Sequence, residues 1–190
     1  MITDGKQTEK AYFTSLKKAI DAETSGHLSL TIKTCDTDRL FETCSEIIAR
    51  SNVNERIWIV VDRDEVKNFD RKIDQVKALA PERVDVAWSN PCFEVWFLYY
   101  FGKAKYFHSS QACWQEFGRL YKARLNNDYD KSEKACRVIY KLLMDCGDEE
   151  KAIQSAEQDH RNHCRKLNTP SNSNPCTTVY QLVAELKKGK

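Results

Sequence analysis

A short apolar run that ends on acidic residues constrains this chain more than any other feature. Residues Ile57–Val61 are β-branched or aromatic at every position, which predicts a central strand that is covered on both faces. Asp62 and Asp64 follow directly, and in an extended chain residues two apart point to the same side. Two adjacent carboxylates repel each other unless a cation lies between them. A single acid would simply keep a loop soluble, but the pair predicts a Mg²⁺ or Mn²⁺ site at the strand end.

Strand and helix patterns alternate through the first hundred residues. The predicted strands cover residues 1–3, 28–32, 57–61 and 84–88, and a helical pattern follows each of them. Four such units in series predict an α/β fold, in which a four-stranded parallel sheet is flanked by helices. We expect the strand order 2-1-3-4, because only neighbouring first and third strands bring the acids at their ends together.

The region after Gly102 shows helical patterns and no predicted strand. The patterns run over residues 110–124, 131–146 and 149–166, with a last helix from residue 179. No glycine- or proline-rich linker separates this region from the first part of the chain. We therefore expect residues 1–105 to form a core and residues 106–190 to form a helical extension that packs on it as one compact unit.

Cysteine usage and hydropathy indicate a reduced protein of the cytoplasm. None of the 8 cysteines belongs to a C-x-x-C pair, and several lie on the apolar faces of predicted helices. No basic-then-apolar leader opens the sequence, and the longest apolar stretch, residues 93–101, is far too short to span a membrane. We expect no membrane partner. The net charge of +2 does not by itself indicate a nucleic-acid partner.

Polar residues follow three of the predicted strands and converge on one rim of the sheet. Asp4 follows the first strand, Asp62 and Asp64 follow the third, and Asn90 follows the fourth. Three carboxylates at this rim can hold one or two metal ions, which neutralise the charge that develops in phosphodiester cleavage and activate a water. Glu94 lies one helical turn after Asn90. It either faces the same rim or is a buried acid satisfied near a helix N-terminus.

Three further residues near the rim have both a functional and a structural interpretation. Lys6 and Arg63 lie beside the acidic positions, where each either touches a scissile phosphate or remains a solvated surface cation. Glu9 lies in the first turn of its predicted helix, which by itself favours a plain interaction with the helix dipole.

The segment Ser-Asn-Pro-Cys occurs twice, at residues 89–92 and 173–176. Each copy precedes a predicted helix, and Asn90 and Pro91 suit the N-cap and the first helical position. The repeat indicates two similar helix caps. The alternative is that both helix N-termini offer backbone N–H groups to phosphate.

Three later groups of residues are weaker candidates for function. His160, His163 and Cys164 share a helix face but lack the second pair of ligands typical of zinc sites. The aromatic residues within residues 93–101 are too continuous for a base-stacking platform and predict core. Cations on the later helices form either a nucleic-acid groove or, more commonly, a solvated face; they are Arg119, Lys122, Arg124, Arg161, Arg165 and Lys166.

Four segments, in order along the chain, resemble the RloB family of Toprim-like proteins. They are Asp4-Gly5-Lys6-Gln7-Thr8-Glu9, Val61-Asp62-Arg63-Asp64, Ser89-Asn90-Pro91-Cys92-Phe93-Glu94 and Asn174-Pro175-Cys176-Thr177. Proteins of this family are found in prokaryotic restriction and phage-defence loci, often beside an ATPase. The family usually has Glu at the position of Asp4, whose carboxylate reaches one methylene less far.

The resemblance implies a Toprim-like fold and a Mg²⁺-dependent nuclease that cleaves DNA or RNA as an effector of anti-phage defence. Metal ligands are then Asp4, Asp62 and Asp64, and the catalytic set also includes Lys6 and Glu94. Glu9, Arg63, Asn90, Asn174 and Thr177 are expected along the substrate-binding or structural rim. One alternative is a catalytically weak Toprim-like subunit that pairs with an ATPase and regulates it. Another is phosphotransfer or nucleotidyl transfer at the same rim.

Overall fold

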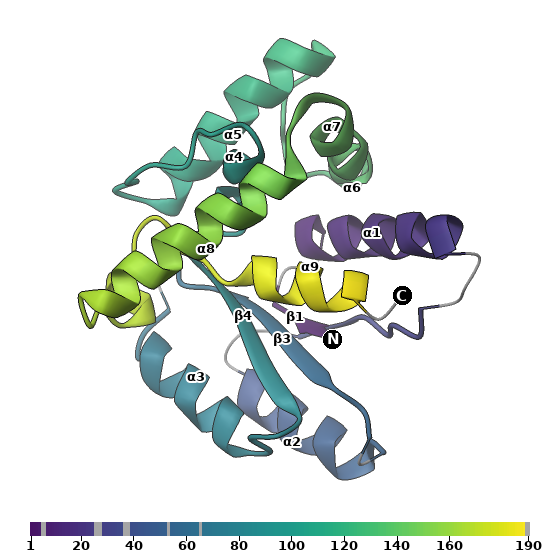
Figure 1. The fold of residues 1–190 in the computed structure, drawn as a ribbon, viewed down its shortest axis with the longest axis vertical. Helices are drawn as coiled ribbons and strands as arrows, with labels where there is room; N and C mark the ends of the chain where they lie inside the picture. The colour runs from purple at the N-terminus through teal and green to yellow at the C-terminus, as the bar shows by residue number, and fades with distance from the viewer. Residues whose placement is uncertain (5–6, 25–27, 36–38, 53, 65, 189–190) are drawn as a thin grey trace.

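The computed structural model describes residues 1–4, 7–24, 28–35, 39–52, 54–64 and 66–188. A five-stranded sheet of order β2-β1-β3-β4-β5 lies at the centre of the molecule (Figure 1). The strands are β1 (Ile2–Thr3), β2 (Lys33–Thr34), β3 (Ile57–Asp62), β4 (Val84–Asn90) and β5 (Cys176–Thr177). The first four strands are parallel, and β5 runs antiparallel to β4.

The sheet differs from the predicted one by the addition of β5. In this strand Thr177 lies opposite Ser89 and Cys176 lies opposite Asn90. A two-residue strand is too short to show a periodic pattern, so the predicted all-parallel, four-stranded sheet is corrected to a mixed sheet of five strands. The observed order places β1 between β2 and β3 and β4 next to β3, as in the predicted 2-1-3-4, but β5 is added and the second strand is formed by other residues than predicted.

The second strand also lies elsewhere than predicted. Residues 28–32 are not a strand, and β2 consists of the exposed Lys33 and Thr34. The alternating apolar residues Leu28 and Ile32 pack instead against the core beside the helices. The N–H of Leu28 donates to Asp21 Oδ1 at 2.7 Å, which fastens this segment to the first helix.

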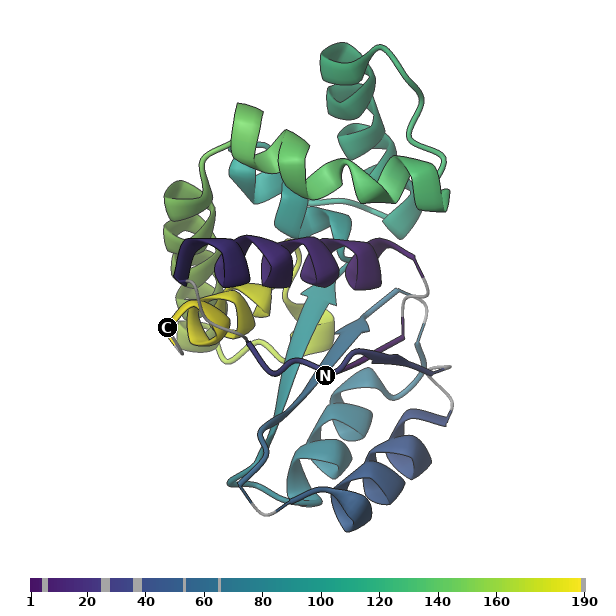
Figure 2. The same ribbon diagram turned by 90° about the vertical axis from the view of Figure 1, so that its right-hand side faces the viewer.

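Helices cover both faces of the sheet. On one face lie α2 (Leu40–Arg50) and α3 (Phe69–Ala78); on the other lie α1 (Thr8–Thr24) and α9 (Val179–Lys188) (Figure 1). Figure 2 shows the sheet between α1 and the α2–α3 pair. Most of the remaining helices stack on the side of α1 and α9; they are α4 (Glu94–Tyr100), α5 (Ser110–Leu125), α6 (Glu133–Arg137), α7 (Ile139–Cys146) and α8 (Glu149–Arg165). The short 3₁₀ turn η2 (Pro170–Asn172) instead contacts α3 and β4.

The helix predicted over residues 131–146 is two helices, α6 and α7, which meet at Val138. The first of them begins late because Lys131 has a φ of 56°, outside the helical region. The hydroxyl of Ser132 then caps α6 by accepting the N–H of Ala135 at 3.3 Å. Both helices contact α1.

The sheet divides the interior into two hydrophobic cores. Beneath it, β-branched residues of β3 and β4 pack against α2 and α3. Above it, the core is larger and rich in aromatic rings: Trp96 and Phe97 of α4 are completely buried, as the aromatic run predicts. All eight cysteines are free thiols. Among the described residues, no helix is both long and apolar enough to cross a bilayer.

Candidate functional site

Asp4 and Asp62 meet at the carboxyl ends of neighbouring strands. In β1 and β3, Thr3 lies opposite Val60 in parallel register. The N–H of Asp4 continues this pairing by donating to the carbonyl of Val60 at 3.2 Å. The N–H of Asp62 donates to Asp4 Oδ2 at 3.3 Å. The adjacency of the first and third strands, predicted from the need to bring these acids together, is therefore confirmed.

The two oxygens of the Asp62 carboxyl group differ. Oδ2 accepts the N–H of Phe93 at 3.0 Å, whereas Oδ1 is buried and has no hydrogen-bond partner among the described residues. Burial raises the pKa of Asp62 well above its usual range, and the charges of Glu9, Asp4 and Glu94 raise it further. Asp62 thus presents an orphaned acceptor within a group of like charges.

Glu9 and Glu94 complete this group, which we call the acidic cluster: Asp4, Glu9, Asp62 and Glu94. Glu9 is only 5% exposed, and its burial together with the Asp4 charge raises its pKa to about 8. Glu94 is 1% exposed. Its Oε1 accepts the Tyr129 hydroxyl at 2.8 Å and lies 2.7 Å from Lys131 Nζ. The hydrogen-bond and ion-pair partners of Glu94 therefore come from the predicted helical extension, and not from the N-terminus of a helix.

The backbone at Asp64 is not extended. Its φ of 33° lies in the left-handed region, so the condition under which Asp62 and Asp64 were expected to point the same way is not met. The physical reason is a tether: the N–H of Asp64 donates to the carbonyl of Pro91 at 2.8 Å. The exposed carboxylate accepts the Ser110 hydroxyl at 2.6 Å. Arg63 donates its guanidinium to the carbonyl of Asp64.

Asn90 is not a helix cap, contrary to the prediction. It ends β4 and is 3% exposed, and its amide donates to the carbonyls of Pro170 and Ser171 at 2.9 and 3.0 Å. The helix that follows begins later, at Glu94, without a side-chain cap. Asn90 therefore joins the sheet to the η2 turn. Its peptide bond to Pro91 is cis.

The second Ser-Asn-Pro-Cys segment also connects separate parts of the chain through hydrogen bonds. Asn174 bonds both backbone groups of Phe107, donating to its carbonyl at 2.7 Å and accepting its N–H at 3.3 Å. Thr177 places its hydroxyl 2.9 Å from that of Ser89 and donates to the carbonyl of Trp88 at 3.1 Å. The helix α9 begins only at Val179. The repeated segments therefore pack together through β4 and β5 and do not cap helices.

A cleft of about 660 Å³ opens over this rim. One side is formed by the strand ends and the other by the segment that leads into α5 and by Lys131. Residue patterns did not identify Tyr106, Ser110, Trp114, Tyr129 or Lys131 as part of the site. No spacing signal marks them, because they reach the rim only through the folding of distant helices. The lining includes Asp62, Asp64, Asn90, Tyr106, Trp114 and Lys131.

Lys6 and the neighbouring Gly5 fall outside the described residues, so the expected role of Lys6 stays a prediction. Within the described ranges, no three His, Cys, Asp or Glu side chains form a ready-made metal site. The weak zinc candidates are used otherwise: His160 Nδ1 lies 3.0 Å from the Tyr180 hydroxyl, and His163 Nδ1 lies 2.9 Å from Asn168 Nδ2.

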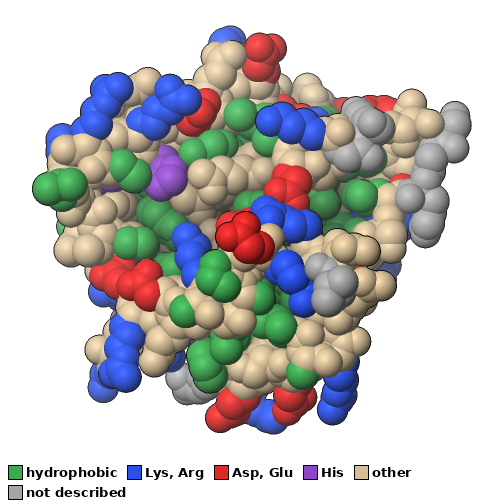
Figure 3. All heavy atoms as spheres, turned by 60° about the horizontal axis from the view of Figure 1, so that its bottom comes forward, with side chains coloured by type: hydrophobic (Ala, Val, Ile, Leu, Met, Phe, Trp, Pro, Cys, Tyr) green, Lys and Arg blue, Asp and Glu red, His purple; other side chains and the backbone are tan. Residues whose placement is uncertain are grey.

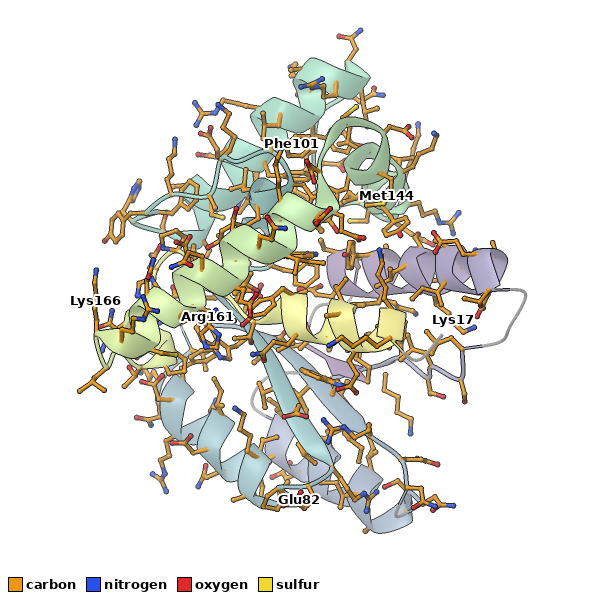
Figure 4. All side chains as sticks on the ribbon, viewed as in Figure 1. Lys17, Glu82, Phe101, Met144, Arg161 and Lys166 are labelled. Atoms are coloured by element: carbon orange, nitrogen blue, oxygen red, sulfur yellow. The ribbon has the colours of Figure 1, made fainter. Side chains whose placement is uncertain are left out.

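The cations of the later helices behave as a solvated surface. Lys122 pairs with Asp128 and Arg161 with Glu157, and Arg119 pairs with Glu116. Figure 4 places Arg161 on α8 and Lys166 at the end of that helix, whereas Arg119 and Lys122 belong to α5. Basic and acidic side chains are interspersed over the face shown in Figure 3. These residues favour the interpretation as an ordinary helix surface.

Comparison with families of known proteins gives a match over nearly the whole chain. The family described as RloB-like protein matches residues 1–186. Neither the curated proteins nor the solved structures yielded a match. The matched range includes every residue of the acidic cluster and the cleft. The chain belongs to the RloB-like family.

Proposed function

We propose that this protein is a Toprim-like, metal-dependent nuclease that cleaves phosphodiester bonds of DNA or RNA at the acidic cluster. The observation that carries the proposal is Asp62 Oδ1, a buried acceptor without a partner among the described residues. It belongs to a carboxylate whose pKa is raised well above its usual range by burial and by Glu9, Asp4 and Glu94. An unmet acceptor and crowded like charges both destabilise a fold, and a hard divalent cation relieves both.

The residues present fit Mg²⁺ or Mn²⁺, since both ions prefer oxygen ligands. Asp62 would bind through its orphaned Oδ1. Asp4 would bind beside it, because Asp4 Oδ2 already lies 3.3 Å from the Asp62 backbone nitrogen. Asp64 would join by releasing the Ser110 hydroxyl. When bound, the ion supplies charge neutralisation at the phosphate and lowers the pKa of a water.

Two side chains of the site can move or balance charge. Glu9, with a pKa raised to about 8 by burial and the Asp4 charge, exchanges a proton near neutral pH. A metal ion bound by Asp4 would offset the Asp4 charge, so Glu9 would release its proton as the ion binds. Lys131 lines the cleft 2.7 Å from Glu94 Oε1 and offers a positive charge close to the position of a bound phosphate.

The test combines melting and cleavage. We expect the wild-type protein to melt higher with Mg²⁺ or Mn²⁺ than with EDTA, and to cut DNA or RNA only with metal. Asp62→Asn should lose both effects. Asp74→Asn is the matched control, because Asp74 is an exposed acid of α3 and should behave as wild type. A wild-type protein that shows neither metal-dependent melting nor cleavage on any nucleic acid would remove the proposal.

The second candidate is a catalytically weak regulatory subunit that partners an ATPase. One observation favours it: Lys131 already brings a positive charge to Glu94, which reduces the cluster's need for metal. The shorter reach of Asp4, relative to the family's usual Glu, points the same way. Asp4→Glu separates the candidates, because it should raise activity or metal affinity in a nuclease. If wild type and Asp4→Glu are both inert and neither responds to metal, the regulatory role is preferred.

A role in prokaryotic anti-phage defence is part of the first candidate and follows from the family resemblance. Its test is infection of cells that carry the gene from its natural locus. We expect wild type to protect the culture and Asp62→Asn to fail. Equal protection by both would separate the defence role from cleavage.

A further inference from the structure

We infer that the cleft takes single-stranded nucleic acid, with phosphates along the α3 side and at least one base stacked on Tyr106 and Trp114. This inference rests on the proposed nuclease function and names the substrate class of the same site. It draws on side chains that the acidic cluster does not use.

The outer wall of the cleft carries two aromatic rings. Tyr106 precedes α5 and is 71% exposed, and the half-buried Trp114 lies one turn into that helix. The other tyrosines and the phenylalanines near the site lie mostly in the core, so an aromatic ring this open contributes little to packing. Both rings line the cleft that contains Asp62. Exposed aromatic faces beside a strand-binding groove are how proteins hold unpaired bases without regard to sequence.

A cation lies against this aromatic wall. Lys131 Nζ lies 5.9 Å from the centroid of the Trp114 ring, while its ion pair with Glu94 ties it to the acidic cluster. The lysine therefore stands between the base-stacking wall and the cluster, where the phosphate that joins a stacked nucleotide to the next one would lie.

The opposite side of the cleft continues into a basic depression of about 410 Å³, with which it shares Arg63 and Ser171. Lys67 and Arg71 also line this depression. Asp70 lies there too, but its carboxylate is occupied by the N–H and hydroxyl of Ser171 at 2.8 and 2.5 Å. These bonds leave Asp70 its negative charge, and Arg63 is engaged by the carbonyl of Asp64. Lys67 and Arg71, however, form no ion pair with a described residue and can meet an anion. A row of lysine and arginine that leads to the acidic cluster suits a phosphate backbone.

The geometry favours a single strand over a duplex. Bases in a duplex are stacked on each other and paired, so their faces are closed to Tyr106 unless the helix is opened at a cost. In a single strand the bases are free to face the aromatic wall while the phosphates face Arg63, Lys67 and Arg71. A protein partner docked on the aromatic wall is the competing occupant, and the test below includes it as an outcome.

Binding can be tested in EDTA, where cleavage is excluded. The probes are fluorescent 12-mers of oligo-dT and oligo-U, a 12-base-pair duplex and an abasic 12-mer, measured by anisotropy. We expect both single strands to bind at least tenfold tighter than the duplex. Tyr106→Ala should weaken single-strand binding at least fivefold and leave the abasic strand unchanged, whereas Tyr106→Phe should retain binding. Phe41→Ala, which truncates a 45%-exposed ring on α2, is the matched control and should bind as wild type.

Arg71→Gln tests the phosphate wall. It should weaken all strands, abasic included, and reduce the dependence of affinity on salt. The inference is overturned if the duplex binds as tightly as the single strands, or if Tyr106→Ala matches Phe41→Ala. A Tyr106 surface used by a protein partner would give that second result.

Cleavage with metal then separates this inference from the proposed function. Cutting of nucleic acid by a protein that prefers duplex would leave the nuclease standing and remove the single-strand inference. Single-strand binding that depends on Tyr106, without cleavage under any metal, would leave the single-strand inference standing and remove the nuclease.

Discussion

Asp62 and Asp64 stand two residues apart, yet their carboxylates have different surroundings. Asp62 lies at the floor of the cleft, and Asp64 lies at its solvent-exposed edge, which is called the rim of the cleft from here on. At the floor, Asp62 is held among Asp4, Glu9 and Glu94, with one oxygen unsatisfied by any described residue. At the rim, Asp64 is exposed and accepts the hydroxyl of Ser110. Water screens the charge more strongly at the exposed rim than at the floor, where Glu9 and Glu94 are buried.

The comparison shows that, at the floor of the cleft, the residues proposed to bind metal lower the stability of the metal-free fold. Crowded, buried charges at the floor cost folding free energy in the metal-free protein, so removing one should stabilise the fold while it destroys the site. Substitutions at the rim should alter binding and leave the fold almost unchanged. The predictions that follow test this contrast, beginning with the largest expected effect.

The largest effect should come from Asp62→Asn. Loss of groups that merely support a metal ligand typically costs about 10- to 100-fold in activity, so loss of this floor carboxylate should cost more than about 100-fold. Asp64→Asn should fall within the 10- to 100-fold range, because the rim carboxylate must first leave Ser110. Single-turnover cleavage rates with saturating Mg²⁺ measure both. A larger loss at Asp64 would reverse the proposed roles of floor and rim.

The metal-free protein should lose stability as the pH rises. Burial and the Asp4 charge raise the pKa of Glu9 to about 8 from its usual value of 4.5, so the folded state favours the protonated acid. That contribution is complete below about pH 4.5 and is lost as the pH rises through about 8. The loss should be on the order of a few kcal/mol.

Urea denaturation in EDTA from pH 5 to pH 9 measures this slope. Glu9→Gln should make the slope shallower, since the amide does not titrate, and Mg²⁺ should flatten it in the wild type. Asp64→Asn at the rim is the control and should keep the wild-type slope. A wild-type free energy of unfolding that rises over this pH range would contradict the description of the floor.

A smaller loss is expected from Tyr129→Phe. The hydroxyl donates to Glu94 Oε1 at 2.8 Å inside the protein, and its removal leaves a buried carboxylate with one donor fewer. The free energy of unfolding should fall by about 1–3 kcal/mol at neutral pH. Chemical denaturation measures the change. Tyr121→Phe is a matched control, because that hydroxyl makes only a 3.3 Å bond to the carbonyl of Ala135.

The smallest effect is expected from Ser110→Ala. This substitution removes the hydroxyl that Asp64 accepts at the exposed rim, so water replaces the lost donor. The free energy of unfolding should change by less than about 0.5 kcal/mol. If this change equals that of Tyr129→Phe in the same denaturation experiment, floor and rim do not differ in the way described here.

Residue patterns located the fold better at its centre than at its edges. The strand β3 and its acidic end were predictable, because an apolar run of this length has few alternatives. The meeting of Asp4 with Asp62 followed from parallel topology. The strand β5 was missed, since a two-residue pairing depends on tertiary contacts and leaves no periodic pattern. The capping role of Asn90 was wrong for the same reason: its partners lie in η2.

The site was predictable only where it depends on strand ends. The position of Glu9 predicts an ordinary helix-dipole acid, and only the family resemblance indicates a role at the site, whereas in the fold Glu9 is buried. Tyr129 and Lys131 come from the turn before α6, and nothing in their sequence context indicates that they meet Glu94. Contacts between distant segments decide such positions, and composition and spacing do not encode them locally.

The strand β5 has a consequence for the making of the protein in the cell. Thr177 meets Ser89 across 88 residues of chain, so synthesis must proceed well past β4 before this strand gains its last neighbour. Until Pro170 and Ser171 have been synthesised, the side-chain amide of Asn90 lacks the two carbonyls to which it donates. Non-local pairings of this kind form late in folding. A nascent or truncated chain that ends before residue 170 therefore carries its acidic residues without a finished cleft.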